Sequence, residues 1–460
     1  MQRRPRIAFY GDDFTGSTDA MECLASAGLR TVLFVDVPDP AVAARFEGLE
    51  AVGIAGNSRT LTPDEMDTAM PPVFAALARL GAPILHYKTC STFDSSPSVG
   101  SIGHVMDLAR DAFGATPFPI VVGAPKLGRY CVFGNLFARH NVDGVVHRLD
   151  RHPTMSVHPT TPMREADLRK HLAAQTPQSI ALLTIVQAAD SVAAAKAALA
   201  KLLDQKPDAV LIDLSDEAGE ATVGALLGAM VRTDGPLFTI GSSGVEYALT
   251  AAWTTEGSLP AARPRLTAGP VDRLLVVSGS CSPTTGAQIA SAVRTGFAEA
   301  ALDPVALIRE GADGSHGEQI LERATETLGQ GRSLVVHSST GPDDPRERQV
   351  VDHYKAAGVT ADLGRIKSGR ALANALGTLL SRLLERVALD RFVVAGGDTS
   401  SASIKLLGID ALEMVAPLAP GAPLCRALAP GRPLHRRELV LKGGQIGGPD
   451  FFVQVRAGRL

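Results

Sequence analysis

Short runs of Val, Ile and Leu recur along the whole chain, and Ala- and Leu-rich stretches of helical length separate them. The runs lack the polar alternation of a strand with one solvated face, so they predict parallel strands that helices cover on both faces. Helices are predicted most clearly over 190–205 and 367–389. This alternation indicates an α/β fold with right-handed crossovers. The predicted strands span residues 6–10, 31–35, 51–55, 84–88, 119–122, 180–185, 209–212, 237–240, 274–277, 334–336, 392–394 and 439–441.

A break in this pattern at 257–271 divides the chain. Pro260, Pro264 and Pro270 cannot donate hydrogen bonds to a sheet, and no apolar period survives there. The sequence therefore predicts a domain over 1–256, a linker over 257–271 and a second domain over 272–460. Each domain is long enough to hold its own core.

Composition and charge exclude several classes of protein. The 460 residues include 45 basic and 48 acidic side chains, and the net charge of -3 disfavours a protein that coats nucleic acid or an anionic membrane. The sequence has no run of about 18 apolar residues, so we expect no membrane span. The five cysteines are widely spaced without a CxxC pair, which disfavours a disulfide scaffold or a zinc knuckle. We expect a cytoplasmic protein without nucleic-acid or membrane partners.

Glycine and serine follow four predicted strands of the second domain, at 278–282, 338–341, 396–400 and 443–448. Small residues there let backbone N–H groups approach a phosphate, and the next helix presents its positive N-terminus. Gly and Ser are common in any one such loop, but four of them in one domain favour a nucleotide pocket. The chain has no Gly-Lys dipeptide and therefore no Walker A loop, and no GxGxxG opens the first helix in either half.

Two carboxylates follow the first predicted strand. Asp12 and Asp13 stand at its end, and Lys88 ends another strand shortly before Ser91 and Asp94. An Asp at this place is expected to cap the next helix. Two of them near a lysine also suit transfer chemistry, in which one takes a proton from a substrate hydroxyl and the other orders a lysine or Mg²⁺. The sequence does not choose between Asp12 and Asp13.

A proline-stiffened segment at 148–163 carries Arg148 and Arg151, and such loops with arginine suit the two-point binding of a carboxylate. His147, His152 and His158 have spacings that do not fit one helical face, and no HExxH accompanies them. We therefore expect no protein metal site, and these histidines are interpreted as loop residues near an anion.

Six segments of the chain form a recognisable set: GDDFTGSTDA at 11–20, KTCSTFDS at 88–95, HPTTPM at 158–163, SGSCSPTT at 278–285, GGDTSSA at 396–402 and LKGGQIGGPDFF at 441–452. Together they resemble the four-carbon acid sugar kinase family. The kinases of this family act on threonate, erythronate and 3-oxo-tetronate, and they have an N-terminal sugar-acid domain and a C-terminal ATP domain. The CSTFDS segment is closest to the 3-oxo-tetronate kinase branch, although Ser101 stands where that branch usually has Asn.

The resemblance implies transfer of the ATP γ-phosphoryl group to the terminal hydroxyl of a small sugar acid. It implies two α/β domains, each with a mainly parallel sheet flanked by helices, and an active site in the cleft between them. Whether the protein forms a homodimer is a question that the resemblance leaves open. The sugar acid should lie over Asp12, Asp13, Lys88, Ser91 and Asp94, with Arg148 or Arg151 as carboxylate partners. ATP, which arrives with Mg²⁺, should meet Ser278, Ser280, Gly396, Gly397, Asp398, Thr399, Gly443 and Gly444.

A non-catalytic sensor that binds a sugar acid and a nucleotide is the main alternative, because it would keep the glycine turns. Such a sensor has no need of the paired carboxylates Asp12 and Asp13. A nucleotide-independent lyase or isomerase is a third hypothesis, but it leaves the glycine-rich second half without a ligand.

Overall fold

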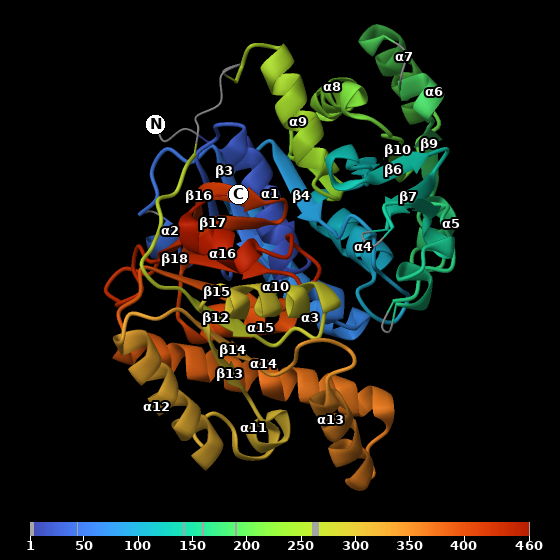
Figure 1. The fold of residues 1–460 in the computed structure, drawn as a ribbon. Coiled ribbons are helices and arrows are strands. Elements are labelled where there is room, and N and C mark those ends of the chain that lie inside the picture. Colours follow the sequence, from blue (N-terminus) through green and yellow to red (C-terminus); the bar gives the residue numbers. More distant parts are fainter. Residues whose placement is uncertain are drawn as a thin grey trace. The chain divides into compact units, whose positions relative to one another are not determined.

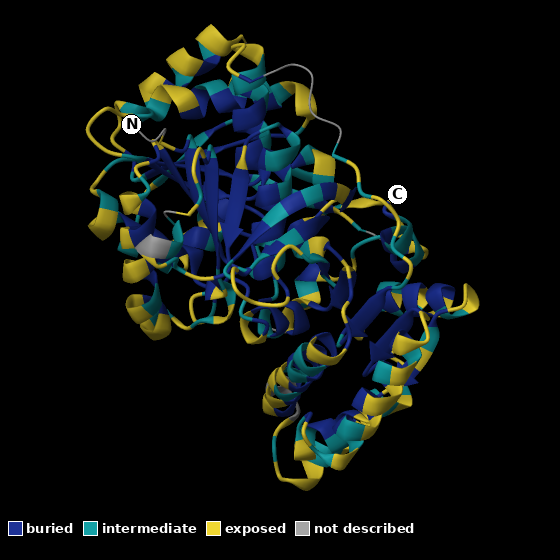
Figure 2. Ribbon diagram, turned by 90° about the vertical axis from the view of Figure 1, so that its left-hand side faces the viewer, coloured by how far each residue is buried: buried dark blue, intermediate teal, exposed yellow. Residues whose placement is uncertain are grey.

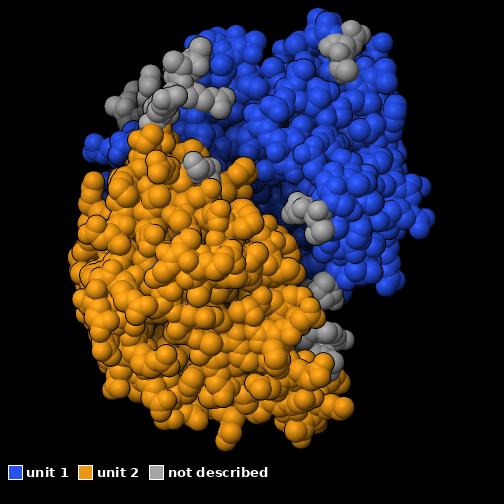
Figure 3. All heavy atoms as spheres, viewed as in Figure 1, with its two compact units in different colours: residues 1–264 blue, residues 265–460 orange. Residues whose placement is uncertain are grey.

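The computed structural model describes residues 4–43, 45–140, 143–158, 161–188, 191–259 and 266–459. The chain divides into two compact units, residues 1–264 and residues 265–460 (Figure 3). Part of the predicted linker, residues 260–265, lies outside the described residues. Within the described ranges, no helix combines the length and the apolar character that a membrane crossing needs.

Unit 1 is built on a sheet in which every pair of neighbouring strands is parallel (Figure 1). Most of these strands are buried along their whole length, which agrees with their continuous apolar sequence (Figure 2). The strand order is β2 (Thr31–Phe34), β3 (Ala51–Ala55), β1 (Ile7–Gly11), β4 (Ile84–Lys88), β11 (Leu237–Gly241), β5 (Phe118–Val121), β10 (Ala209–Ile212) and β9 (Ile180–Leu183).

Helices cover this sheet in two groups. One is a row in which α1 (Phe14–Ser26) packs on α9 (Gly244–Thr255), α9 on α8 (Glu220–Met230), and α8 on α7 (Val192–Leu203). In the other group, α3 (Pro63–Arg79) packs on α4 (Ile102–Phe113), and both bury apolar side chains against β1 and β4. The shorter helices are α2 (Pro40–Ala43), α5 (Leu168–Ala173), α6 (Ile185–Ala188), η1 (Ser58–Thr60), η2 (Pro125–Leu127), η3 (Leu149–Arg151), η4 (Met155–Val157) and η5 (Glu217–Gly219).

Unit 1 also holds a small antiparallel sheet that the sequence pattern did not predict. Its strands are β6 (Arg129–Val132), β7 (Asn135–Arg139) and β8 (Val146–Arg148), and β7 pairs with both of the others. The strands are short and only partly buried, so they lack the apolar runs that marked the main sheet. The segment at 128–135 holds β6, the turn and the first residue of β7.

Unit 2 carries a second, mainly parallel sheet. In the strand order given below, the first five strands pair in parallel with their neighbours. The sixth strand pairs antiparallel with both the fifth and the seventh. The sequence pattern missed β13, β16 and β17, because β13 has only small residues and a glutamate, and prolines interrupt the other two. The strand order is β13 (Ala298–Ala301), β14 (Leu334–His337), β12 (Leu275–Ser278), β15 (Arg391–Ala395), β18 (Glu438–Lys442), β17 (Ala422–Leu428) and β16 (Ala411–Ala419).

The helices of unit 2 pack in two sets. In one, α14 (Ala361–Arg386) packs against α11 (Pro304–Glu310), α12 (Ser315–Gly329), α13 (Pro345–Ala356) and α15 (Gly397–Leu406). In the other, α10 (Pro283–Arg294) packs against α16 (Phe451–Ala457).

The two clearest helix predictions are confirmed, with shifted ends. The helix predicted over 190–205 is α7, which begins after the N-cap Ser191, and Asp190 lies outside the described residues. The helix predicted over 367–389 is α14, which begins earlier, after Thr360. Gly364 and Gly369 lie inside α14, and glycines weaken the helical signal in a sequence.

Candidate active site

Three neighbouring strands of unit 1 end side by side. In the register of the sheet, Gly11 at the end of β1 lies opposite Ala55 of β3 and Lys88 of β4. The backbone N–H of Asp12 donates to the carbonyl of Lys88 at 2.8 Å, and the N–H of Arg59, in η1, donates to the carbonyl of Asp12 at 3.0 Å. The parallel register therefore brings Asp12, Arg59 and Lys88 to one edge of the sheet.

The guanidinium of Arg59 holds the acidic residues of this edge together. Its Nη2 lies 2.8 Å from Oδ1 of Asp12, and its Nη1 lies 2.8 Å from Oδ2 of Asp13. Nη1 also lies 3.9 Å from Oδ2 of Asp94. Asp12 is 2% exposed, whereas the side chain of Asp13 is 27% exposed. One guanidinium thus compensates two adjacent carboxylates, and only Asp13 offers appreciable surface to a ligand.

Asp13 is also the N-cap of α1. Its Oδ1 accepts a hydrogen bond from the backbone N–H of Gly16 at 2.6 Å, and its Oδ2 accepts one from the Thr15 hydroxyl at 3.0 Å. The capping interaction fixes the carboxylate at the positive end of the helix. Asp13 therefore caps the helix, as expected from the sequence, and also lies in the candidate site.

The two carboxylates differ in acidity. Burial raises the pKa of Asp12, and the nearby Arg59 only partly offsets it. Burial would also raise the pKa of Asp13, but Arg59, Lys88 and the hydrogen bonds of its helix cap outweigh that effect and lower it. Asp13 is therefore ionised at neutral pH.

Lys88 is almost completely buried beside these carboxylates. Its Nζ lies 3.4 Å from Oδ2 of Asp19 and donates to the carbonyl of Thr89 at 3.0 Å. Burial would lower the pKa of Lys88, but the carboxylates of Asp19, Glu246 and Asp13 raise it. The lysine is therefore a fixed positive charge at the strand end.

Asp94 has an oxygen that is suited to a ligand. The residue is 7% exposed, and its Oδ1 is buried without a hydrogen-bond partner among the described residues. Its neighbour Phe93 is fully buried with a φ of 56°, a strained conformation for a residue with a side chain. Ser91 lies half-buried in the same loop. An unpaired buried acceptor of this kind suits a hydroxyl donor from a substrate.

The strand ends of unit 2 form a second cluster. In the register of the sheet, Ala395 of β15 lies between Ser278 of β12 and Lys442 of β18. The glycines that follow let these loops approach closely: a side chain at Gly279 would collide with Thr399 Oγ1, and Gly396 has a φ of 116°. The segments that carry Ser280, Thr399 and Gly444 are therefore neighbours at this edge of the sheet.

The two helices that begin at this edge differ at their N-termini. The side chain of Ser282 caps α10 by accepting the N–H of Thr284 at 3.2 Å. At α15 the N-cap is Gly396, which has no side chain to accept a hydrogen bond. Gly397 and Asp398, the first residues of α15, are exposed, and space is open where a side chain at Gly397 would lie. The first N–H groups of α15 are thus suited to a phosphate.

Lys442, which precedes Gly443, is completely buried at the end of β18. Its Nζ donates to the hydroxyl of Thr285 at 3.0 Å, and that hydroxyl donates to the carbonyl of Gly444 at 2.8 Å. Burial lowers the pKa of Lys442 to about 7. No carboxylate is recorded within ion-pairing distance of it in the described parts of the chain. A buried cation of this kind favours the binding of an anion.

Comparison with known proteins gives the two units different classes of ligand. Residues 7–249 match the family described as a sugar-binding N-terminal domain, and residues 275–452 match the one described as a nucleotide-binding C-terminal domain. The chain belongs to the four-carbon acid sugar kinase family. The resemblance stated from the sequence is therefore confirmed, and so is the α/β fold class.

The curated relatives of this kinase are similar over nearly the whole chain. A 3-oxo-isoapionate kinase of Paraburkholderia graminis is 48% identical over 99% of this chain and 94% of its own length. A 3-oxo-tetronate kinase of Pseudomonas fluorescens is 33% identical, over 98% of this chain and 96% of its own length. A solved structure from Salmonella typhimurium is 26% identical over 99% of both chains, with a TM-score of 0.76. The protein is therefore a phosphotransferase that acts on a sugar acid.

The structure brings together only part of the substrate site predicted for this kinase. Arg59 contacts Asp12 and Asp13 and lies near Asp94, and the carbonyl of Lys88 accepts the N–H of Asp12. Arg148 is exposed and is bound by Asp150 through two hydrogen bonds of 2.7 and 2.6 Å, and Arg151 is exposed.

Arg129 is a basic residue near Asp94 that the sequence did not single out. Burial lowers the pKa of Arg129, and the nearby carboxylate of Asp94 partly offsets this effect. Its Nε is buried without a hydrogen-bond partner among the described residues.

Sequence reasoning also missed Arg59 and Lys442. Lys442 stands directly before Gly443 in the segment 441–452 that carried the resemblance, so its position at a strand end was a usable signal. Arg59 follows the predicted strand 51–55 at a short distance, but its neighbours have no recognised pattern. Its role depends on the pairing of β3 with β1, which the sequence does not show.

A cavity of about 600 Å³ lies elsewhere in unit 1. Its lining is mostly apolar, with Phe34, Phe46 and Leu80 among the residues, and Arg4 and Arg79 add charge. None of the strand-end carboxylates lines it. Size alone therefore does not identify the site of transfer in this kinase.

Proposed function

We propose that this kinase transfers the γ-phosphoryl group of ATP to a hydroxyl of a 3-oxo sugar acid. The observation that carries the proposal is the cluster around Arg59, in which the accessible carboxylate of Asp13 lies beside the partly buried Arg59 and the buried Lys88, and Asp94, with one unpaired oxygen, lies near Arg59. The names of the relatives support an oxo acid, and the 48% identity favours 3-oxo-isoapionate as the first acceptor to test. The four-carbon acceptors 3-oxo-tetronate, threonate and erythronate follow it.

We assign the proton acceptor to Asp13 on geometry. The raised pKa of Asp12 would make it the stronger base, but Asp12 is 2% exposed and Arg59 engages both of its oxygens. Asp13 is ionised, is held by its helix cap and has exposed surface. In phosphoryl transfer the protein mainly positions the groups and neutralises charge, so orientation matters more than basicity.

The transfer step balances within this assignment. The hydroxyl oxygen of the acid forms a bond to the γ-phosphorus while the bond from that phosphorus to the β–γ bridging oxygen breaks. ADP leaves with that bridging oxygen, and the hydroxyl proton goes to the Asp13 carboxylate. Asp12 keeps Arg59 in place, and Lys88 and Arg59 stabilise negative charge at the acceptor.

The remaining polar groups of unit 1 are proposed to recognise the sugar acid. Oδ1 of Asp94 is placed to accept a substrate hydroxyl, and Ser91 lies in the same loop. Arg129 is the proposed partner for the carboxylate, because it lies near Asp94 and its Nε is buried without a hydrogen-bond partner among the described residues. Arg148 and Arg151 stay as alternative partners, although Arg148 would first have to release Asp150.

The nucleotide is proposed to bind at the strand ends of unit 2. The first N–H groups of α15, at Gly397, Asp398 and Thr399, and the buried Lys442 would hold the phosphates. Ser278, Ser280, Gly443 and Gly444 would line the approach. Mg²⁺ would neutralise phosphate charge, and because it keeps several of its waters, few ligands from the protein are needed.

ADP release with Mg-ATP against a panel of sugar acids tests the proposal. The panel contains 3-oxo-isoapionate, 3-oxo-tetronate, threonate and erythronate, with five-carbon straight-chain acids as controls. We expect acid-dependent ADP release, fastest with one of the 3-oxo acids. Nucleotide binding without turnover on any acid would instead support the sensor, and fastest turnover on threonate or erythronate would overturn the oxo-acid assignment.

A further inference from the structure

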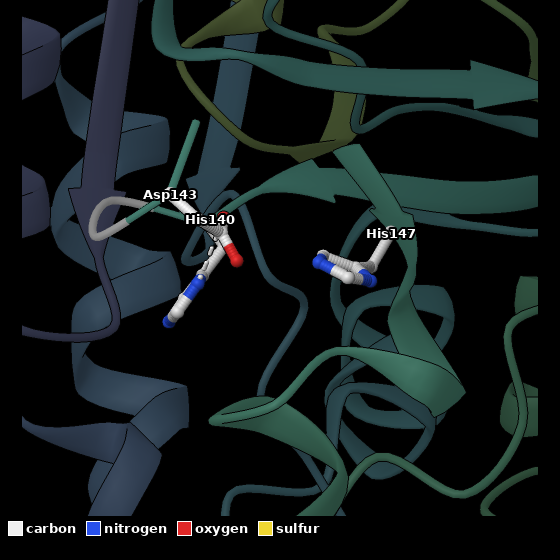
Figure 4. A group of neighbouring side chains, drawn as sticks. All are labelled: His140, Asp143 and His147. Carbon is white, nitrogen blue, oxygen red and sulfur yellow. Dashed lines mark ion pairs between the residues drawn. The ribbon is translucent and has the colours of Figure 1, made fainter. Parts of the chain in front are cut away.

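The β7–β8 hairpin places two histidines and an aspartate close together. Backbone pairing sets His147 opposite Ala138, and the N–H of His140 donates to the carbonyl of Val145 at 2.8 Å. His140 directly follows β7, and alternation along the chain puts it on the same side as Ala138, so His140 and His147 are diagonal neighbours on one face of the hairpin. Asp143 projects from the turn that joins the strands (Figure 4).

The donor atoms of these three side chains converge. One ligand atom from each of His140, Asp143 and His147 lies within 4.8 Å of the other two. Nδ1 of His140 is 3.0 Å from Oδ1 of Asp143. Nε2 of His147 is buried and has no hydrogen-bond partner among the described residues. Figure 4 shows the ring of His147 facing the other two side chains across a small gap.

A third histidine packs beside the cluster, but its Nδ1 is already engaged. The His152 ring lies 5.3 Å from the ring of His140 and 5.9 Å from that of His147. Its Nδ1 accepts hydrogen bonds from the backbone N–H groups of Thr154 and Met155 at 3.1 and 3.2 Å. The tautomer is thereby set with the proton on Nε2. His152 therefore supports the rings of the other two histidines and is not a ligand.

We infer that His140, Asp143 and His147 form a binding site for a divalent transition-metal ion, with Zn²⁺ as the best match. Two imidazoles and one carboxylate are a borderline nitrogen and oxygen donor set, which favours Zn²⁺, Co²⁺ or Ni²⁺ over Mg²⁺ or Ca²⁺. Bonds of about 2.0–2.2 Å to a tetrahedral Zn²⁺ place two donors roughly 3.4 Å apart, so small side-chain rotations close the present arrangement. A water molecule completes the four ligands.

The sequence predicts loop histidines near an anion. The structure differs, because the two histidine ligands come from the two sides of a hairpin, which pair only in the folded protein. Its effect is structural: an ion here ties the turn at Asp143 to both strands. Arg129 donates through Nη1 to the carbonyl of Arg139 at 3.3 Å, next to His140. A metal ion bound here therefore stabilises the end of β7, to which Arg129 donates this hydrogen bond.

Metal titration of the full-length protein, freed of any polyhistidine tag and of metal, tests the inference. Co²⁺ is the first probe, because tetrahedral coordination by nitrogen and oxygen gives an intense visible absorption. Zn²⁺ is then measured by equilibrium dialysis. We expect one ion per chain, a higher Tm on binding, and binding weakened at least about tenfold in His140→Ala and in His147→Ala. His353→Ala, on α13 of unit 2, is the matched control and should bind as the wild type does.

Two outcomes overturn the inference. One is a wild-type protein that binds no stoichiometric Co²⁺ or Zn²⁺, and the other is binding that both histidine variants retain. Should either variant fail to fold by circular dichroism, the wild-type Co²⁺ spectrum decides, because only the tetrahedral site gives the intense band.

Discussion

Arg59 holds Asp12 with two nitrogens, Nη2 at 2.8 Å from Oδ1 and Nε at 3.3 Å from Oδ2. The same guanidinium reaches Asp13, so the acidic pair at the end of β1 depends on a residue that follows β3. Without Arg59, two adjacent carboxylates would repel each other beside a buried strand end, and Lys88 would be the main positive charge left near them.

We predict that Arg59→Ala lowers kcat/KM for the sugar acid by at least about 100-fold and destabilises unit 1 by about 2–4 kcal/mol. Arg59→Lys should recover part of the stability, because it restores a charge, but little of the activity, because it lacks the planar fork. Steady-state kinetics and urea unfolding measure the two effects. Arg232→Ala removes an exposed pair with Asp234 and is the control that should change neither. Wild-type kinetics in Arg59→Ala would contradict the assignment.

Replacement of Asp13 by Asn should lower kcat by about 100- to 10000-fold with little change in the affinity for ATP. Asn caps a helix about as well as Asp, so the fold should be retained, while the proton acceptor and the charge that faces Arg59 are lost. Asp303→Asn is the matched control, because Asp303 caps α11 in the same way, accepting the N–H groups of Val305 and Ala306. Unchanged turnover in Asp13→Asn would remove Asp13 from the mechanism, and the same test on Asp12 would follow.

Lys442 should make stability depend on pH. Its pKa is about 7 in the folded protein, against 10.5 in the unfolded chain, so between these values the unfolded state binds the extra proton. The free energy of unfolding should therefore rise with pH across this window, by up to about 1.4 kcal/mol per pH unit relative to Lys442→Met. Below pH 7 both states are protonated and the difference becomes constant. Denaturant unfolding from pH 6 to 10 compares the two proteins.

Nucleotide binding should also protonate Lys442. A phosphate near Nζ favours the charged form and raises its pKa, so ATP binding near pH 8 should take up a proton. Calorimetry in two buffers of different ionisation enthalpy detects this uptake, which Lys442→Met should abolish. Equal apparent enthalpies in both buffers for the wild type would place the phosphates away from Lys442.

Gly397→Ala should raise the KM for ATP at least roughly tenfold without destabilising the protein. A methyl group at this position meets no protein atom within 4 Å, so the fold tolerates it, but it occupies the open space before the first N–H groups of α15. Alanine in a helix is about 0.5–1 kcal/mol more stable than glycine, so Tm should stay or rise. Gly228→Ala in α8 also meets open space and is the matched control. An unchanged KM for ATP would argue against phosphate binding at α15.

The sequence by itself determined the alternation of strands and helices, because apolar runs and caps such as Ser191 act locally. It also located the carboxylates, the lysine and the glycine turns, since strand ends are visible as the points where an apolar run stops. The sequence did not predict the small antiparallel sheet, because partly exposed strands such as β7 have no apolar run.

Only the tertiary structure decided which strand ends meet. The order of β3, β1 and β4 brings Arg59 to Asp12, and strand order depends on pairing between distant segments, which leaves no local trace in the sequence. The same reason applies to His140 and His147, which become diagonal neighbours only once β7 and β8 pair. Burial, which gives Asp12 and Lys442 their shifted pKa values, is likewise a property of the packed fold, because every residue is solvated in the unfolded chain.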